Sequence, residues 1–365
     1  MKRARSVPAW SPLIITVAVT VLTGLTLEGA ARISFRIRHG YRFEDSLLYV
    51  ADPVFDYRIN PRYRDPAISA RTMPRGVIGP RREDGRLRVI ALGESMTWGH
   101  RNDYAHTWPA QLQVRLDESG RVMSGGIEVM NAGTPGYGSR QLLVRFEREI
   151  IPLAPALVII DATWNGVGSL ADRRAWRPGN VAGHDATMPR RIAAGLTQHS
   201  LLVAKFHLFD LMDDAPLPSL EPVGEVFRED LRALALGAKS QGIPLAFLQA
   251  PAVWTLDGGE QEHRLLTQIS PAQARYWTSA RSNQHLARQI IGQVASEFTL
   301  PVLDAAAAFE PLQVTERTAL FTDYMHLSNG GNVLLADALA PQVFRLLQQT
   351  SGRRLASTRG PADDR

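Results

Sequence analysis

One serine lies where a buried strand is expected to end and a helix to begin. The apolar run at residues 89–92 leads through Gly93 into Ser95, a pattern that predicts a strand followed by a tight turn. A serine in this place is exposed at the carboxyl end of a strand, where open α/β sheets bind their ligands. The amides at the start of the following helix favour negative charge nearby. The position therefore suits a nucleophile whose reaction develops an oxyanion.

A histidine and an aspartate near the C-terminus are the best partners for this serine. A serine hydroxyl is a poor nucleophile near neutral pH and needs a base within hydrogen-bond reach. His326 is the candidate base, because Asp323 lies three residues earlier in the same loop. That spacing lets the carboxylate fix the tautomer of the imidazole and stabilise the imidazolium. Together, these three residue types predict acyl transfer through a covalent acyl-enzyme.

Two further turns offer donors for the oxyanion of a tetrahedral intermediate. Gly136 lies in a glycine-rich turn after the second predicted strand, and Asn165 follows the third. We expect the backbone amides of Ser95 and Gly136 and the side-chain amide of Asn165 to act as donors. Each of these turns follows a strand, so a parallel sheet brings them to one edge.

The elements that must position these residues alternate between strand and helix. Strands are expected at residues 89–92, 127–131, 156–161, 244–249 and 301–304. Helices are expected at residues 104–118, 139–151, 225–241, 283–297 and 329–349. This alternation predicts a three-layer α/β/α domain around a five-stranded, mainly parallel, doubly wound sheet.

The residues that could do chemistry fall in four short blocks along the chain. In order, the blocks are Gly93-Glu94-Ser95, residues 131–136, Trp164-Asn165-Gly166 and residues 323–326. This ordered set resembles the motifs of the SGNH hydrolases in the GDSL esterase/lipase superfamily, and the chain is similar to their membrane-anchored bacterial members. The resemblance covers about residues 86–349 and implies a flavodoxin-like fold. It also implies that Ser95 is the nucleophile, His326 the base and Asp323 its orienter, with the oxyanion hole formed by Ser95, Gly136 and Asn165.

Two blocks depart from the family pattern. Glu94 replaces the aspartate that usually precedes the serine, and we expect it to alter the packing and capping of the turn. The third block lacks the usual Gly-x-Asn-Asp, because Thr163 and Gly166 flank Trp164 and Asn165. This leaves the oxyanion asparagine in place and puts Trp164 at the rim of the acyl pocket.

The first thirty residues predict a membrane anchor. Lys2, Arg3 and Arg5 precede an uncharged run of 22 residues, 6–27. A helix of that length spans roughly 33 Å, about the thickness of the hydrocarbon core. A cleaved signal peptide is the alternative, with a small-residue site at 29–31. We expect a single-pass anchor in the cell membrane with the catalytic domain in the periplasm, although basic residues on both sides of the span leave its orientation open.

We divide the chain into four parts. They are an anchor or signal sequence at 1–31, a juxtamembrane connector at 32–85, an SGNH hydrolase-like domain at 86–350 and a disordered tail at 351–365. The connector is polar and carries a short edge strand near 54–59. Insertions are expected near 168–222, as a solvated loop or a cap over the substrate cleft, and near 250–281. The second insertion carries Trp254 and Trp277, which either pack beneath it or line a sugar-binding surface.

Composition excludes several classes of function. The formal net charge is +5, but the 41 basic residues are almost all arginine and are scattered, so we expect no nucleic-acid binding. The absence of cysteine excludes disulfides and thiolate chemistry. No grouping of His, Asp and Glu has metal-ligand spacing, and we expect no metal and no cofactor. His100 and His106 lie near Ser95 in sequence, and we expect both to be solvated.

We therefore expect a serine ester hydrolase that acts on carboxylic or carbohydrate O-acyl esters, in particular O-acetyl groups on envelope or exported glycans. Its partners would be the ester-bearing small molecule or glycan and the cytoplasmic membrane. An O-acyltransferase is the first alternative, because the same acyl-enzyme passes its acyl group to a sugar hydroxyl instead of water. A membrane-tethered binding protein with weak catalysis is the second. The sequence indicates neither acyl length nor oligomeric state.

Overall fold

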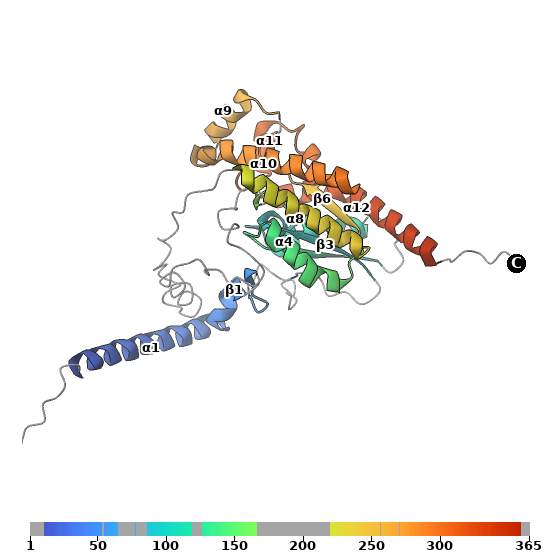
Figure 1. The fold of residues 1–365 in the computed structure, drawn as a ribbon. Helices are drawn as coiled ribbons and strands as arrows, with labels where there is room; N and C mark the ends of the chain where they lie inside the picture. The colour runs from blue at the N-terminus through green and yellow to red at the C-terminus, as the bar shows by residue number, and fades with distance from the viewer. Residues whose placement is uncertain are drawn as a thin grey trace, which may run out of the picture. The chain divides into compact units, whose positions relative to one another are not determined.

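The computed structural model in Figure 1 describes most of the chain. The described residues are 11–52, 55–64, 77, 86–118, 126–165, 220–255, 257–269 and 271–358. Those up to Arg64 belong to one compact unit, and those from 77 onward belong to a second. Each unit is described by itself. The insertion predicted at 168–222 lies outside the described residues up to residue 219.

Five parallel strands form the sheet of the second unit. They are β3 (Leu87–Gly93), β4 (Ile127–Gly133), β5 (Leu157–Asp161), β6 (Leu245–Gln249) and β7 (Val302–Asp304). Their spatial order is β4-β3-β5-β6-β7, and every neighbouring pair is parallel. This is the strand order of a flavodoxin-like sheet. The predicted five-stranded fold is confirmed, with all five of these strands parallel.

The strand order reverses at β3, which lies between β4 and β5. Gly93 at the end of β3 is in register with Gly133 of β4 and Asp161 of β5. The three strands therefore end at one level, and the turns that follow them leave from the same edge. Doubly wound sheets bind ligands at such a switch point.

Helices cover both faces of this sheet. The helices of these two layers are α3 (Trp108–Glu118), α4 (Ser139–Arg145), α8 (Leu220–Ser240), α10 (Pro271–Phe298) and α12 (Asn329–Thr358). On one face α3 packs against α12, and on the other α4, α8 and α10 lie together (Figure 1). The strands are consequently buried on both sides, and residues 89–92 and 157–160 are apolar without interruption. Such continuous runs are typical of parallel sheets.

Shorter elements connect the layers, and several helices differ from the predicted ranges. The short elements are α2 (Ser95–Trp98), η2 (Tyr104–His106), η3 (Phe146–Ile150), η4 (Ile151–Leu153), α9 (Glu260–Ile269), η6 (Ala306–Ala308) and α11 (Val314–Ala319). The helix predicted at 104–118 is broken at Thr107, whose backbone is extended. α10 begins at Pro271, since proline is favoured in the first turn of a helix, and α9 and α10 fill much of the predicted insertion at 250–281.

The last helix is longer than predicted. α12 continues to Thr358, past the predicted domain end at 350 and into the segment predicted to be a disordered tail, 351–365. Arginine, leucine and alanine at 353–356 have high helix propensity, which accounts for the extension.

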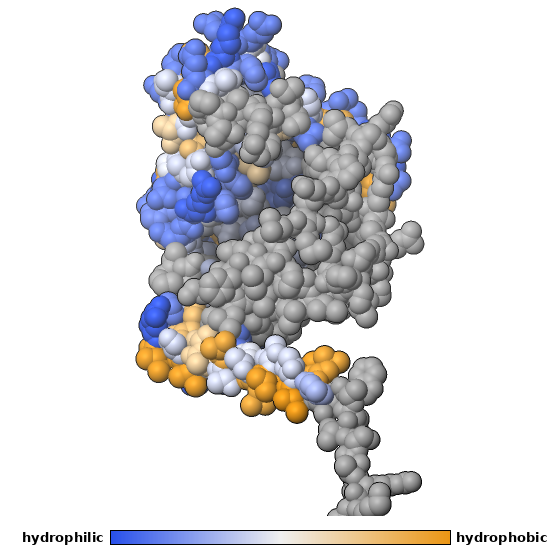
Figure 2. Space-filling view, turned by 90° about the vertical axis from the view of Figure 1, so that its left-hand side faces the viewer, coloured by the Kyte–Doolittle hydropathy of each residue, from blue (hydrophilic) through white to orange (hydrophobic). Residues whose placement is uncertain are grey.

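The N-terminal unit holds the apolar helix α1 (Ser11–His39). Its segment Pro12–His39 is long and apolar enough to serve as a membrane span or a signal anchor. Exposed hydrophobic side chains cover this helix (Figure 2). After η1 (Phe43–Ser46), β1 (Tyr49–Asp52) pairs with β2 (Asp56–Ile59) in an antiparallel hairpin. The strand predicted near 54–59 is thus present, but it belongs to this two-stranded sheet rather than to an edge of the large one.

Candidate active site

Ser95 is held at the edge of the sheet by a turn that requires glycine. It begins α2 directly after Glu94, and only 8% of the residue is exposed. A β-carbon at Gly93 would lie 2.3 Å from Thr97 Oγ1 and 2.8 Å from Asp161 Cβ, distances at which atoms clash. Glycine therefore allows β3 to end directly against the short helix that carries Ser95.

His326 connects Ser95 to Asp323 through hydrogen bonds at both ring nitrogens. The distance from His326 Nε2 to Ser95 Oγ is 2.7 Å, and the distance from Nδ1 to Asp323 Oδ2 is 2.6 Å. Asp323 Oδ1 also accepts the backbone N–H groups of Met325, at 3.0 Å, and His326, at 2.8 Å. Because these bonds close a tight loop, a spacing of three residues is enough for the carboxylate to reach the imidazole. The structure thus brings together the three residues that the sequence predicted.

The Asp323 carboxylate is strongly acidic. Burial raises its pKa, but hydrogen bonding to the His326 ring, the charge of His326 and the two backbone N–H donors outweigh this and lower the pKa to about 2. Asp323 is therefore ionised across the neutral range. An ionised carboxylate on Nδ1 places the proton there and leaves the Nε2 lone pair free to face the Ser95 hydroxyl.

A second imidazole packs beside His326. The ring centroids of His100 and His326 are 4.6 Å apart. Burial, the neighbouring His326 and Arg101 lower the pKa of His100, which favours its neutral form. His100 is exposed, as the sequence predicted, but no local pattern marked its ring contact with His326. The His106 side chain is 43% exposed, and its ring nitrogen Nδ1 lies 2.7 Å from Asp103 Oδ1, as suits a surface residue.

The predicted oxyanion donors lie on either side of the Ser95 turn. Gly136 follows β4, and its φ of +80° is a left-handed backbone angle that favours glycine. Asn165 follows β5, so the two residues come after the strands on either side of β3, the strand that leads to Ser95. The Ser95, Gly136 and Asn165 turns therefore share one sheet edge. The oxyanion hole itself stays a prediction.

Comparison with known proteins places the chain in a family. A sequence profile of the GDSL-like Lipase/Acylhydrolase family matches residues 91–334, about two thirds of the chain. The chain belongs to this family. It is accordingly a hydrolase that acts on ester bonds. No curated protein matched the chain.

Solved structures of low sequence identity resemble the chain. A putative lipolytic protein of the G-D-S-L family from Desulfitobacterium hafniense DCB-2 is 16% identical, with a TM-score of 0.42 over 70% of this chain and 99% of the other. The acetyl xylan esterase AlAXEase is 16% identical, with a TM-score of 0.44 over 70% and 100%. A lipase/acylhydrolase from Enterococcus faecalis is 15% identical, with a TM-score of 0.44 over 70% and 95%. Likenesses this remote carry no argument about substrate.

The two motif blocks that depart from the GDSL pattern, the first and the third, are in direct contact. The backbone N–H of Asn165 donates to Glu94 Oε2 at 2.7 Å, and Glu94 is completely buried. Glu94 occupies the N-cap position of α2, yet its side chain makes no capping hydrogen bond to that helix. The helix therefore lacks a side-chain cap at this position, in line with the expectation that Glu94 alters the capping of the turn. The longer side chain instead reaches across to the third block of this GDSL-family chain.

Buried hydrogen bonds fix α2 to the two neighbouring strands. Asn131 Nδ2 donates to Thr97 O at 2.7 Å, and Asn131 Oδ1 accepts Gly133 N at 2.8 Å. Thr97 Oγ1 donates to Asp161 Oδ2, also at 2.7 Å. Burial raises the pKa of Asp161 to about 6, although the bond from Thr97 opposes the shift. Sequence reasoning missed Thr97 and Asp161; the only signal was a carboxylate at the end of an apolar strand.

Three aromatic rings pack between the third and fourth motif blocks. Trp164 meets Trp254 edge-on at 5.9 Å, and Trp254 stacks on Tyr324 with its centroid 5.9 Å away and the planes 13° apart. Trp164 is buried rather than placed at a solvent-exposed rim. The side chain of Trp277 lies outside the described residues. In the described part of the chain, no group of His, Asp and Glu side chains is arranged to hold a metal ion.

Proposed function

We propose that this GDSL-family chain hydrolyses esters through a covalent intermediate on Ser95. The continuous chain of hydrogen bonds from Ser95 through His326 to Asp323 carries the proposal. As Ser95 Oγ attacks the ester carbonyl, its proton moves to His326 Nε2, and the resulting imidazolium is stabilised by Asp323. His326 then gives that proton to the departing alcohol, which leaves an acyl group on Ser95.

Water then hydrolyses the acyl-enzyme, and the proton transfers run in the opposite direction. His326 takes a proton from the attacking water, the bond between the acyl carbon and Ser95 Oγ breaks, and the proton returns to the serine as the carboxylic acid departs. The depressed pKa of Asp323 supports this role, because the carboxylate stays ionised while His326 gains and loses its proton.

The developing oxyanion is assigned to the backbone amides of Ser95 and Gly136 and the side-chain amide of Asn165. The position of these residues after three adjacent strands supports the assignment. Each such donor typically contributes about 10² to 10³ in rate. The Glu94 carboxylate, by accepting the backbone N–H of Asn165, holds the third donor in place.

We assign the substrate to O-acyl, in particular O-acetyl, esters of envelope or exported glycans. The apolar helix α1 supports attachment to the cytoplasmic membrane. We assign the catalytic domain to the periplasmic side, where an enzyme acting on envelope glycans would meet its substrate.

An ester panel tests this function. The full-length protein in detergent is offered 4-nitrophenyl esters of increasing acyl length and acetylated oligosaccharides, with Ser95→Ala and His326→Ala as controls. We expect hydrolysis by the wild type and a loss of at least about a thousandfold in each variant. Wild-type turnover that persists in Ser95→Ala would overturn the mechanism. Free acid that falls when a glycan acceptor is added would instead indicate acyl transfer.

A further inference from the structure

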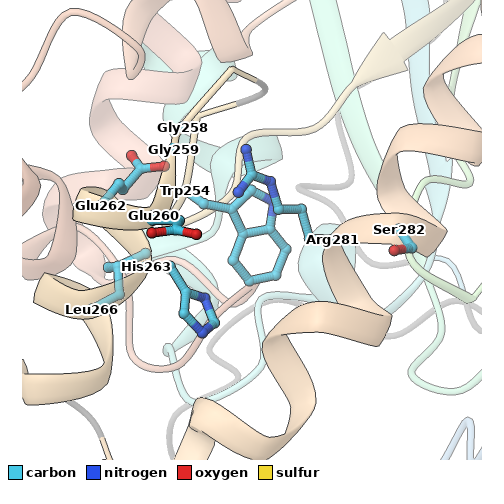
Figure 3. A pocket seen from close by; sticks show the side chains of 9 residues that line it. All are labelled: Trp254, Gly258, Gly259, Glu260, Glu262, His263, Leu266, Arg281 and Ser282. Carbon is cyan, nitrogen blue, oxygen red and sulfur yellow. The ribbon is translucent and has the colours of Figure 1, made fainter.

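The loop that carries His326 packs against a buried tryptophan. Trp254 stacks on Tyr324, which lies two residues before His326. The backbone N–H of Val253 also donates to Tyr324 O at 3.2 Å. The indole N–H of Trp254 donates to Gln284 Oε1 at 2.6 Å, and Figure 3 shows the ring at the wall of a cavity that α9 and α10 also border. Packing and hydrogen bonds therefore fix the part of the loop that precedes His326.

The residue after His326 is held by an asparagine from a distant part of the chain. Asn102 Nδ2 donates to Leu327 O at 2.9 Å and to His100 O at 3.0 Å. The backbone N–H of His100 in turn donates to Ser95 O at 3.0 Å. Because Leu327 follows His326 directly, a short series of hydrogen bonds connects the backbone of the nucleophile to the backbone of the base.

The turn that presents Asn102 has a backbone conformation that residues with side chains rarely adopt. Gly99 ends α2 with a φ of +89°, and Arg101 has a φ of +66°. This left-handed region is unfavourable for a residue as bulky as arginine. Such a conformation persists only where the surrounding contacts determine it. The backbone N–H of Asn102 donates to Gly99 O at 2.9 Å and its side chain bonds His100 O, so Asn102 closes this turn.

A second asparagine bonds the end of the same loop but has a different role. The Nδ2 of Asn332 donates to Ser328 O at 3.0 Å and, at the longer distance of 3.5 Å, to Leu327 O. Its Oδ1 accepts the backbone N–H of Trp108 at 2.9 Å. The completely buried Asn332 thus joins the first turns of α12 and α3. Asn102 is only partly buried and joins two loops at the site, so its loss should disturb the site more than the fold.

The position of the base matters because proton transfer depends steeply on distance. His326 Nε2 lies 2.7 Å from Ser95 Oγ, and a misplacement of about 1 Å can cost about 10² in rate. We propose that Asn102 is a positioning residue that holds His326 at this distance from Ser95. Its side chain bonds backbone carbonyls, so it acts through His326 rather than on the substrate. The assignment rests on the proposed ester hydrolysis for its purpose, and it adds a residue outside the four motif blocks.

Steady-state kinetics on 4-nitrophenyl acetate test this role in the full-length protein. Asn102→Ala removes both side-chain hydrogen bonds, and we expect kcat to fall between about tenfold and a hundredfold with KM nearly unchanged. Rates are measured below the thermal unfolding transition of each variant, so a loss of stability alone leaves kcat unchanged. Gln111→Ala is the matched control, because it removes a 2.7 Å bond from the same kind of amide to Ala105 O. An unchanged kcat in Asn102→Ala, or an equal loss in the control, would overturn the proposal.

A double-mutant cycle shows whether Asn102 acts through the base. We expect Asn102→Ala to cause no further loss of kcat in protein that already carries His326→Ala, because the group that it positions is then absent. Losses that multiply would contradict a positioning role, since a general disturbance of the site also lowers the residual rate.

The distance itself is measured without catalysis. Crystal structures of the full-length wild type and of Asn102→Ala compare the separation of Ser95 Oγ and His326 Nε2. We expect a hydrogen bond in the wild type and a separation above about 3.5 Å in the variant, beyond hydrogen-bond range. An unchanged separation would overturn the proposal. If the wild type cleaves no ester, the proposed function fails, while this comparison still decides the role of Asn102.

Discussion

The two sides of the Ser95 turn are built in different ways. On the relay side, His326 and Asp323 come from one short loop and reach Ser95 through side-chain hydrogen bonds that follow the family pattern. On the side of the proposed oxyanion hole, Asn165 lies in a block that departs from the pattern, and the buried carboxylate of Glu94 accepts its backbone N–H. The bond between Asp323 and His326 thus depends on a local motif. The proposed oxyanion side depends on the contact between Glu94 and Asn165, which lie in the two blocks that depart from the family pattern.

Loss of the relay base should have the largest effect. His326→Ala removes the group that takes the proton from Ser95, and kcat should fall by on the order of 10⁴ to 10⁶. His100→Ala is the matched control, since it removes a neighbouring imidazole that the mechanism does not use. Steady-state kinetics on a 4-nitrophenyl ester compare the two variants, and similar losses in both would contradict the assignment of the base.

Removal of one oxyanion donor should have a smaller effect. Asn165→Ala deletes the side-chain amide but keeps the backbone N–H that bonds to Glu94, so the turn retains its support. We expect kcat to fall by about 10² to 10³ with little change in KM, because the donor acts mainly on the transition state. An unchanged kcat would exclude Asn165 from the oxyanion hole.

Two substitutions of Glu94 test its hydrogen bond to Asn165, which joins the two motif blocks that depart from the family pattern. Glu94→Asp shortens the side chain by one methylene, about 1.5 Å, which lengthens the 2.7 Å bond to Asn165 N beyond hydrogen-bond range. We expect kcat to fall about tenfold, equivalent to ~1.4 kcal/mol, with KM nearly unchanged. Glu94→Gln keeps the length and an acceptor oxygen, so it should retain most of kcat. Full activity in the aspartate variant would show that Glu94 does not position Asn165.

Asp161 accepts a hydrogen bond from Thr97 in the short helix that begins at Ser95. Its substitution should affect stability more than rate. Its pKa is raised to about 6 in the folded protein, so the folded state favours the protonated form. This stabilisation is complete below the unfolded pKa near 4 and is lost as the pH rises through 6. Asp161→Asn cannot ionise, so its stability relative to the wild type should increase between pH 4 and pH 7, by up to about 3 kcal/mol. Chemical denaturation of both proteins across this range measures the difference, and a constant difference would contradict the raised pKa.

The sequence was sufficient for the features that local pattern determines. Apolar runs that end in turns predicted all five strands of the sheet, and the Asp323 to His326 spacing predicted the relay. The contact of Glu94 with Asn165 could not be predicted, because it joins residues 71 apart and depends on the reach of one extra methylene. The Thr97 bond to Asp161 spans 64 residues and is likewise a tertiary contact.

The helical second insertion was missed for a different reason. Its tryptophans suggested either packing or sugar binding, and sequence alone had no means to orient the rings. In the structure, Trp254 is buried and packs on Tyr324 and Trp164, which confirms the packing interpretation for this residue.

Covalent labelling of the nucleophile tests the central claim most directly. Full-length wild-type protein, Ser95→Ala and His326→Ala are treated with a fluorophosphonate, digested and analysed by peptide mass spectrometry. The account predicts one adduct on the peptide that contains Ser95, no adduct in Ser95→Ala and much slower labelling in His326→Ala. No labelling of the wild type, or equal labelling of Ser95→Ala, would contradict it.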